Sequence, residues 1–478
     1  MSHESSPQRR AAALAEALRC APGHSQLVVA SVPAPPGAAA RLRGVLEGEH
    51  TVSWASGNRE GQDGPIVVGL GAARLVQTSG PERFAQAQEG LRHAFACLGY
   101  ADDETARMPL RFYGGAAFVP GRDASGCWES FGDAAFVLPR WLYVDEGATA
   151  RLAVVAERAD GTSNAVRARA EELLTYAAEA ASQAEARPIA PESPRLTAEL
   201  ECRESTSKAE WYELIDSIRT GIRSGTYAKV VAARRSTLRL SPAPDPATVL
   251  ARLDELAPRC TRFGLRIGER TFLGATPERL VRRTGTRVWT EAIAGSISAS
   301  VAGGAERLLE SQKDLAEHRY VVDAIVAVLA PLAARVEVSE RPQVRQLRHI
   351  LHLCTPITAE LSKDVHLLEL VARLHPTPAV GGVPTERALD WIVTREPATR
   401  GWYASPFGWV DAHGDGEMVV ALRSALINGD RAHLYAGAGI VDESDAAAEY
   451  EETEVKLAGM RAALGLGPEA KKSDESPA

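Results

Sequence analysis

The amino-acid sequence predicts an α+β fold, in which long mixed strands form a layer and helices pack outside it. Short runs rich in β-branched and aromatic residues recur along all 478 residues and are bounded by turn residues. Segments with helical spacing of apolar residues lie between these runs. No internal repeat of fixed period interrupts this alternation, so we expect one mixed architecture and not a repeat array.

The first 195 residues are expected to form the N-terminal part of the fold. A short helix is expected within residues 1–22, and two further helices at 84–100 and about 163–185. Five segments have strand character: residues 26–32, 65–71, 111–120, 134–144 and 151–157. The Pro/Glu/Ala-rich stretch at 186–195 is the best linker in the chain.

The second half, from about 205 to 462, alternates more clearly. Residues 208–225 form an amphipathic pattern that ends in glycine, which predicts a helix, and a strand is expected at 227–235. Further strands are expected at 271–275, 286–290, 407–411, 418–424 and 433–438. Helices are expected at about 309–335, 385–395 and 445–464. Residues 466–478 are polar and are expected to be disordered.

Composition excludes several classes of partner. The net charge of −8 and the pI of about 5.9 give no general attraction to nucleic acid or to anionic membranes. Six cysteines occur without a C-x-x-C pair, and the polar start lacks the apolar core of a secretory signal. We therefore expect a cytoplasmic protein that binds neither nucleic acid nor membrane.

The last expected helix clusters carboxylates. Glu449 and Glu452 are three residues apart and Lys456 is four beyond Glu452, so all three lie near one helical face. Together with Glu317, which opens another helix, they are candidates to bind a hard cation such as Mg²⁺. Each is also explained by a solvated helix surface with an ordinary salt bridge or cap.

Two residues are candidates for acid–base chemistry. Lys229 stands inside the apolar segment Y-A-K-V-V-A-A, where a lysine can serve as a general base. Glu278 follows F-L-G-A-T-P and could act as a general acid in a cleft. The alternatives are an outward-facing lysine and a turn glutamate.

Several further residues suggest anion binding. Arg423 has apolar neighbours in V-V-A-L-R-S-A, which makes a bidentate carboxylate clamp plausible. Gly437, Ala438 and Gly439 form a G-A-G turn that can present backbone N–H groups. A second small-residue turn, A-I-A-G-S, offers Gly295 and the hydroxyl of Ser296. His375 precedes a proline, and it is either a ligand-binding or a packed core histidine.

The order of these segments resembles that of the chorismate-utilising enzymes, which include isochorismate, salicylate, anthranilate and aminodeoxychorismate synthases. The resemblance covers residues from about 205 to 462. It is carried by Y-A-K-V-V-A-A-R, G-A-T-P-E-R-L, E-A-I-A-G-S, K-D-L-A-E-H, L-H-P-T-P-A-V-G-G, V-V-A-L-R-S-A, Y-A-G-A-G-I-V and E-E-T-E-V-K-L. It implies the large layered α/β sandwich of the anthranilate synthase component I type.

Within the family, the chain is most similar to menaquinone-type isochorismate synthases. The resemblance implies that Lys229 activates water and that Glu278 protonates the departing C4 hydroxyl. It also implies that Glu317 and Glu452 bind Mg²⁺, with Glu449 supporting the metal through water. Arg423 and the backbone from Gly437 to Gly439 would hold the pyruvyl carboxylate.

The same resemblance adds Gly295, Ser296, His375, Tyr403 and Lys456 as residues that bind chorismate or isochorismate. A lysine at position 229 disfavours anthranilate synthases, and Ala294 stands where some aminodeoxychorismate synthases carry a covalent lysine. We therefore expect no glutaminase subunit, and we expect a monomer.

Salicylate synthase stays open as an alternative, because it forms isochorismate and then expels pyruvate. Tyr403 and Leu422 would suit that branch, whereas the intact H-P-T-P-A-V motif favours isochorismate synthase. A protein that binds chorismate without turning it over is a further alternative. The product could feed menaquinone or a siderophore, and the long N-terminal region favours menaquinone.

Overall fold

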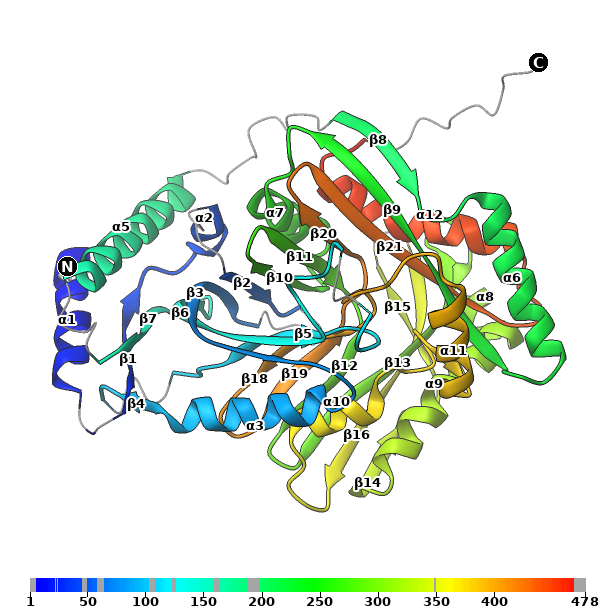
Figure 1. The fold of residues 1–478 in the computed structure, drawn as a ribbon, viewed down its shortest axis with the longest axis horizontal. Coiled ribbons are helices and arrows are strands. Elements are labelled where there is room, and N and C mark those ends of the chain that lie inside the picture. Colours follow the sequence, from blue (N-terminus) through cyan, green and yellow to red (C-terminus); the bar gives the residue numbers. More distant parts are fainter. Residues whose placement is uncertain are drawn as a thin grey trace.

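A forked antiparallel sheet organises the molecule (Figure 1). The computed structural model describes residues 6–467 apart from 22, 24, 45–49, 58–63, 103–107, 123–125, 159–163, 187–197 and 348–349. Within these residues all 21 strands join one hydrogen-bonded sheet, and every pairing is antiparallel except that between β1 and β4. The α+β prediction is confirmed.

The elements of the N-terminal half are α1 (Pro7–Cys20), β1 (Leu27–Ala34), α2 (Ala39–Gly44), β2 (His50–Ala55), β3 (Ile66–Thr78), α3 (Arg83–Ala96), β4 (Leu98–Tyr100), β5 (Phe112–Ala116), β6 (Ala134–Asp145), β7 (Ala150–Glu157) and α5 (Asn164–Ala186).

The middle of the chain forms β8 (Ala198–Glu204), α6 (Lys208–Arg223), β9 (Lys229–Ser241), α7 (Pro246–Leu256), β10 (Thr261–Ile267), β11 (Arg270–Thr276), β12 (Arg279–Thr284), β13 (Arg287–Ser298), α8 (Gly304–Glu310) and α9 (Gln312–Leu329).

The remaining elements are β14 (Ala333–Val338), β15 (Gln343–Gln346), β16 (Ile350–Leu361), α10 (Leu367–Leu374), β17 (Gly382–Val383), α11 (Thr385–Arg395), β18 (Pro406–Val410), β19 (Gly416–Val420), β20 (Ser424–Asn428), β21 (Arg431–Ile440) and α12 (Ala446–Ala463).

The fork in the sheet starts at β6, which pairs along one edge with β3 and along the other with β5 and β7. One branch continues from β3 through β2, β10, β11, β20 and β21 to β9. The other runs from β5 through β18, β19, β12 and β13 to β16. Strands from before residue 195 and after it therefore belong to the same sheet, through β2–β10 and β5–β18.

The space between the branches is filled by aromatic side chains. Phe263, Phe272 and Phe407 contact one another, and Trp54 stacks on Phe407 while Trp402 contacts both Phe272 and Phe407. All of them are buried. Large apolar surfaces of this kind supply most of the free energy that holds two sheet layers together.

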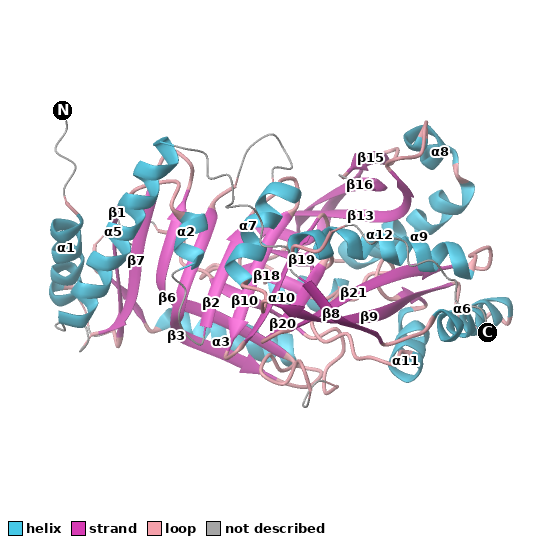
Figure 2. Ribbon diagram, turned by 90° about the horizontal axis from the view of Figure 1, so that it is seen from above, coloured by secondary structure: helices cyan, strands magenta, loops and turns pink. Residues whose placement is uncertain are grey.

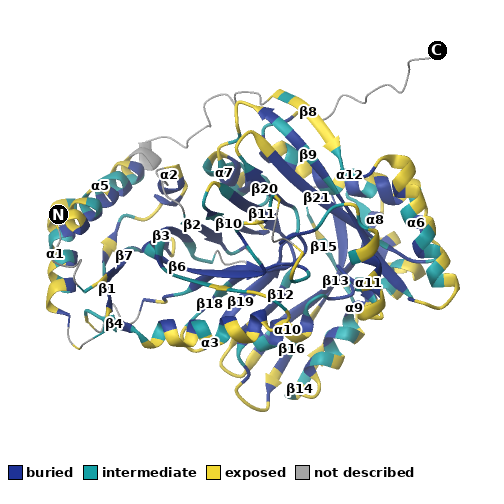
Figure 3. Cartoon of the chain, in the orientation of Figure 1, coloured by how far each residue is buried: buried dark blue, intermediate teal, exposed yellow. Residues whose placement is uncertain are grey.

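Helices cover the outside of the sheet, as the yellow outward faces and blue strands of Figure 3 show. Helices α1 and α5 pack together over the β1–β7 end, and α12 lies on β21 while α9 lies on β13. Figure 2 shows that the branch ends, β9–β21 and β13–β16, flank α9 and α12 on the same side of the molecule. This end of the sandwich carries the cavity described below.

Local sequence signals set the helices around that end. Ser207 and Glu210 form a capping box that starts α6, and Gly225, with a positive φ of 75°, follows its last turn. Ser311 caps α9 and Asp445 caps α12, each by accepting a backbone N–H with its side-chain oxygen. The two caps fix the first residue of each helix, and they thereby set where the carboxylates of α9 and α12 lie.

The structure corrects some expected elements. The segment 418–424 is not one strand, because β19 ends at Val420 and Arg423 adopts a left-handed backbone with φ of 51° before β20 begins. The helix expected at 309–335 is wrong at both ends, because residues 309–310 belong to α8, α9 spans Gln312–Leu329 and β14 begins at Ala333. The linker beyond Ala186 and residues 468–478 of the expected tail lie outside the described residues.

Candidate active site

A cavity of about 200 Å³ lies between the two branch ends and is lined mainly by polar side chains. Strands β9 and β21 line one side, β13 and β16 another, and α9 and α12 contribute carboxylate and lysine side chains. The connections after β11 and β19 add Glu278 and Arg423. The described lining residues come from ten separate segments of the sequence, which only the sandwich fold brings together.

Lys229 is the first residue of β9 and is fully buried. Its Nζ lies 2.8 Å from Oε1 of Glu317 on α9, and it has no other partner among the described residues. The sequence places it next to Val230 and Val231, whose burial in the sheet draws the lysine inside as well. The buried position predicted for Lys229 is therefore the one the structure shows.

Glycine at position 439 makes room for this ion pair. A Cβ at Gly439 would lie 2.5 Å from Oε1 of Glu317 and 2.9 Å from Cε of Lys229. Contacts below about 3 Å are repulsive. Only glycine therefore allows Lys229 and Glu317 to meet against the backbone of β21.

The G-A-G and A-I-A-G-S segments are strands and not turns, which corrects the sequence interpretation. Residues 437–439 lie inside β21 and pair with β9, and Ala438 does not line the cavity. Residues 292–296 lie inside β13, with a bulge at Gly295, whose φ is 76°. Small residues are needed here for close approach of strands and helices.

Glu278 is buried between β11 and β12. Its amide donates to Oγ1 of Thr276 at 3.2 Å, and its carbonyl accepts from the amide of Val420 at 3.1 Å. Both backbone groups are thus anchored, and the side chain lines the cavity. Glu278 and Lys229 come from different elements, so they could act on separate atoms of one ligand.

The carboxylates of α12 each pair with a lysine. Glu449 lies 3.3 Å from Nζ of Lys313, and Glu452 lies 2.6 Å from Nζ of Lys456. Ser296 also donates to Glu452 at 3.0 Å, and Lys456 donates to the carbonyl of Gly437 at 2.8 Å. Both carboxylates thus line the cavity and are not on a solvated helix surface.

The acidic side chains of this cluster have shifted pKa values. Burial, followed by repulsion from Glu452, raises the pKa of Glu449. Burial disfavours the charged form of Glu452 as well, but Lys456 outweighs it and holds the pKa of that carboxyl below its ordinary value. Burial and the nearby Glu317 raise the pKa of Asp314.

Three carboxylates on one cavity are a donor set that suits a hard cation. In this structure Glu317, Glu449 and Glu452 each face a lysine instead. Among the described residues no group of three acidic, histidine or cysteine side chains is arranged to hold a metal. The chemistry of the donor set fits Mg²⁺, and its side chains would have to turn from the lysines to coordinate one.

Arg423 and Tyr403 also line the cavity. Arg423 has no salt bridge among the described residues, and burial lowers the pKa of its guanidinium. Tyr403 stacks on Tyr435 with 5.2 Å between ring centroids, and burial raises the pKa of Tyr403 to about 12. The hydroxyl of Tyr435 accepts a hydrogen bond from Nε1 of Trp128 at 2.9 Å. A cation and two flat rings on one wall suit a cyclic carboxylate.

His375 does not line the cavity. Its Nε2 donates to the carbonyl of Phe118 at 3.2 Å, and its ring meets the Phe118 ring edge-on at 5.3 Å. Burial lowers its pKa to about 3, so it is a neutral core histidine. The prediction that His375 binds the substrate is therefore wrong. The H-P-T-P-A-V motif instead contributes Ala379 and Val380 to the cavity.

Sequence reasoning missed five lining residues: Lys313, Asp314, His352, Arg400 and Tyr435. A signal existed for Asp314, which precedes Glu317 by three residues and shares its helical face. Arg400 donates to the carbonyls of Val231 and Val380 and pairs with buried Glu396, which ties β9 to the 379–380 segment. For His352, whose pKa burial lowers to about 3, the sequence carried no signal.

Comparison with known proteins identifies the family to which the chain belongs. The model of the family described as chorismate binding enzyme matches residues 25–465. This chain belongs to the chorismate-binding enzyme family. The isochorismate synthase MenF of Bacillus subtilis is 33% identical over 84% of this chain and 85% of its own length. The salicylate biosynthesis isochorismate synthase of Pseudomonas aeruginosa is 35% identical over 82% of each chain.

Solved structures agree with the fold. The menaquinone-specific isochorismate synthase MenF of Escherichia coli superimposes with a TM-score of 0.77 and 28% identity, covering 96% of this chain and all of that one. Anthranilate synthase component I of Streptococcus pneumoniae gives a TM-score of 0.60 at 19% identity, which shows the fold alone. The predicted layered architecture of the family is therefore confirmed. No described helix is long and apolar enough to cross a membrane.

Proposed function

We propose that this protein is an isochorismate synthase, which converts chorismate to isochorismate by adding water at C2 while the C4 hydroxyl leaves. The carrying observation is a buried lysine next to a polar cavity that also holds a buried acid. Lys229 does not itself line the cavity, but its Nζ lies 2.8 Å from Oε1 of the lining residue Glu317, and the separate acid Glu278 lines the same cavity. The relatives named isochorismate synthase, which cover most of the chain, support the same activity.

The chain's residues would divide the proton traffic. Lys229, in its neutral form, takes a proton from the water whose oxygen bonds to C2. Glu278, in its protonated form, gives its proton to the C4 oxygen as that bond breaks, and the ring double bonds shift between the two carbons. One water enters and one leaves, so the net reaction is an isomerisation.

Charge balance supports a divalent cation. With Glu278 protonated, as the proposed reaction requires, the cavity lining carries four carboxylates (Asp314, Glu317, Glu449, Glu452) against four basic side chains (Lys313, Arg400, Arg423, Lys456). A doubly negative substrate would leave this enclosure strongly negative, which is costly in a low-dielectric site. Glu317, Glu452 and Glu449 would hold Mg²⁺, which would supply electron withdrawal at the substrate carboxylate.

Arg423 would bind the second carboxylate, since it is the cavity cation without an acidic partner. Lys456 and Ser296 would release Glu452 to the metal and donate to the substrate. The aromatic wall of Tyr403 and Tyr435 would pack against the ring. The pathway that we propose is menaquinone biosynthesis; the cytoplasmic location and monomeric state stay predictions.

Salicylate synthase is the second candidate, because one relative is named for salicylate biosynthesis, although as an isochorismate synthase. The discriminating experiment mixes protein, Mg²⁺ and chorismate and follows products by chromatography and salicylate fluorescence. Isochorismate alone supports the proposal. Salicylate with an equal amount of pyruvate would replace it with the second candidate.

A mutation tests the role of the buried lysine. Lys229→Gln should lower kcat by at least about 100-fold, the range expected when a general base is lost. Lys208→Gln is the matched control, because Lys208 is more than half exposed and contacts only the surface carboxylate of Glu451 and the ring of Tyr450 among the described residues. Full turnover by folded Lys229→Gln protein would remove Lys229 from the mechanism.

A further inference from the structure

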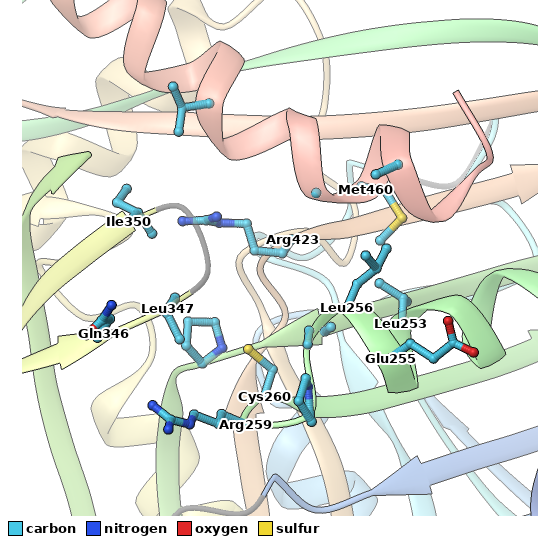
Figure 4. Close-up of a pocket in the computed structure, with 17 residues that line it drawn as sticks. Leu253, Glu255, Leu256, Arg259, Cys260, Gln346, Leu347, Ile350, Arg423 and Met460 are labelled. Carbon is cyan, nitrogen blue, oxygen red and sulfur yellow. The ribbon is translucent and has the colours of Figure 1, made fainter. Parts of the chain in front are cut away.

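A second and larger pocket, of about 620 Å³, adjoins the catalytic cavity and shares Arg423 and Pro277 with it (Figure 4). Its walls come from the end of α7, the loop that leads to β10, the adjoining ends of β15 and β16, and the second half of α12. A volume of this size is typical of sites that bind small organic molecules. Neither the proton transfers nor the cation site uses it.

The walls of this pocket are fixed by arginine side chains behind them. Nη1 of Arg262 donates to the carbonyls of Pro258 and Cys260 at 2.9 and 2.7 Å, which holds the loop that forms one wall. Nε of the same arginine donates to Asp254 on α7 at 3.0 Å. Arg252 links α7 to α12 by donating to the carbonyl of Ala463 at 3.2 Å. The pocket is therefore preformed and does not need a ligand to shape it.

The lining is mostly apolar, with the half-buried cation Arg423 at its inner end and the exposed side chains of Glu255 and Arg259 among the other lining residues. Apolar side chains from three walls face the space: Leu253, Leu256, Leu347, Ile350, Val455 and Met460. The guanidinium of Arg423 extends across the pocket towards Ile350 (Figure 4). Because Arg423 has no acidic partner within salt-bridge distance among the described residues, an anion in this pocket would meet an unpaired guanidinium.

We propose that this pocket binds a small apolar monocarboxylate, such as a fused-ring aromatic acid, with its carboxylate on Arg423 and its rings between α7 and α12. Burial of the rings supplies affinity, and the guanidinium sets the orientation. A doubly charged, hydroxylated ring acid suits this lining poorly, because most of the wall offers it no hydrogen-bond partner.

Because both cavities are lined by Arg423, a ligand in the larger pocket should affect catalysis. This step rests on the function proposed above. A carboxylate held from the outer side competes for the guanidinium that would hold the substrate carboxylate on the inner side. Binding in the two cavities is then antagonistic, and linkage makes the antagonism reciprocal. The pocket is thus a site at which an aromatic acid inhibits turnover.

Gly459 offers a clean way to fill the pocket. It lies on the exposed face of α12 at the pocket's edge, and a Cβ placed on it would have no heavy atom within 4 Å. Gly459→Trp therefore adds an indole at the edge of the pocket, where the Cβ itself meets no neighbour, and the ring is expected to occupy part of the pocket. Gly459→Ala adds only a methyl group and is the matched control, since both substitutions remove a helix-interior glycine.

Titration calorimetry with 2-naphthoate on the full chain tests the proposal without any need for turnover. Wild type and Gly459→Ala should bind one equivalent, and Gly459→Trp should bind at least tenfold more weakly with an unchanged melting temperature. In kinetics, 2-naphthoate at its dissociation constant should about double the KM of wild type for chorismate and leave that of Gly459→Trp unchanged.

Absence of saturable binding to wild type would overturn the proposal. Equal affinity of Gly459→Trp and Gly459→Ala would also overturn it, because the probe would then occupy the catalytic cavity. Failure of the proposed function is distinguishable, since it abolishes chorismate turnover and leaves the calorimetric results as expected.

Discussion

Gly439→Ala should damage catalysis more than it damages the fold. The added Cβ would lie 2.5 Å from Oε1 of Glu317 and 2.9 Å from Cε of Lys229. To reach ordinary contact, the carboxylate must move by about 1 Å and the lysine by about half as much. Glu317 can turn its flexible end away, whereas Lys229 is fully buried and has no free space to enter.

The magnitude follows from these displacements. Overpacking by one methyl group costs about 1–3 kcal/mol of unfolding free energy, and the mobile carboxylate favours the lower end of that range. A base displaced by a fraction of an ångström to 1 Å costs up to about 100-fold in kcat/KM. We therefore expect a folded protein with a slightly lower melting temperature and a kcat/KM reduced by between tenfold and 100-fold.

The assay is the initial rate of chorismate consumption with Mg²⁺, alongside guanidinium unfolding of the same preparation. Gly459→Ala is the control, because its Cβ enters open space. Unchanged kcat/KM in Gly439→Ala would refute the inference that β21 needs glycine in order to admit the Lys229–Glu317 pair. Equal losses in both variants would refute it too.

Three further outcomes are expected. The pKa of His375 is about 3 in the folded protein and 6.5 in the unfolded chain, so the wild type loses stability as pH falls from 6 to 4. His375→Gln should make this fall of the unfolding free energy shallower by about 1.4 kcal/mol per pH unit. An unchanged slope would contradict this. Trp128→Phe should remove the hydrogen bond to Tyr435 and cost about 1 kcal/mol with a raised KM for chorismate; an unchanged KM would separate Trp128 from the cavity wall. Glu396→Gln should cost about 3–5 kcal/mol in chemical unfolding, because it leaves Arg400 charged and buried without its partner.

The last of these has a matched control on the surface. Glu369 and Arg373 form an ion pair of the same sequence spacing, but both side chains are more than one-third exposed. Glu369→Gln should cost no more than about 0.5 kcal/mol. Similar losses for Glu369→Gln and Glu396→Gln would show that burial of the Arg400 pair contributes nothing.

The sequence predicted strands and helices where local patterns were strong. Capped amphipathic segments such as α6 and α12 were placed to within two residues, because their first-turn hydrogen bonds are local. Strand β16 was missed, although it is the partner of β13 along its whole length. Its pairing with β13 joins residues more than fifty positions apart, which no local pattern encodes, although its other partners, β14 and β15, directly precede it in the sequence.

The site residues also differ in how far the sequence could predict them. Lys229, Glu317, Glu449 and Glu452 were candidates from their local sequence, each with an ordinary alternative, and the resemblance to the chorismate-utilising enzymes assigned them to one site. The role of the glycines was misread, since their function is to allow β21 and β13 to approach side chains from α9, and that contact is invisible in sequence. His375 was assigned to ligand binding because a buried histidine looks the same in sequence whether it packs or binds.

The chemistry proposed for the cavity is tested most directly by the fate of solvent oxygen. Incubation of the protein with Mg²⁺ and chorismate in ¹⁸O-labelled water, followed by mass spectrometry and NMR of the product, should give isochorismate that carries ¹⁸O in its C2 hydroxyl and has lost the C4 hydroxyl. Unlabelled isochorismate would contradict water addition at C2. Salicylate as the sole product would contradict isochorismate synthase as the activity of this protein and favour the second candidate.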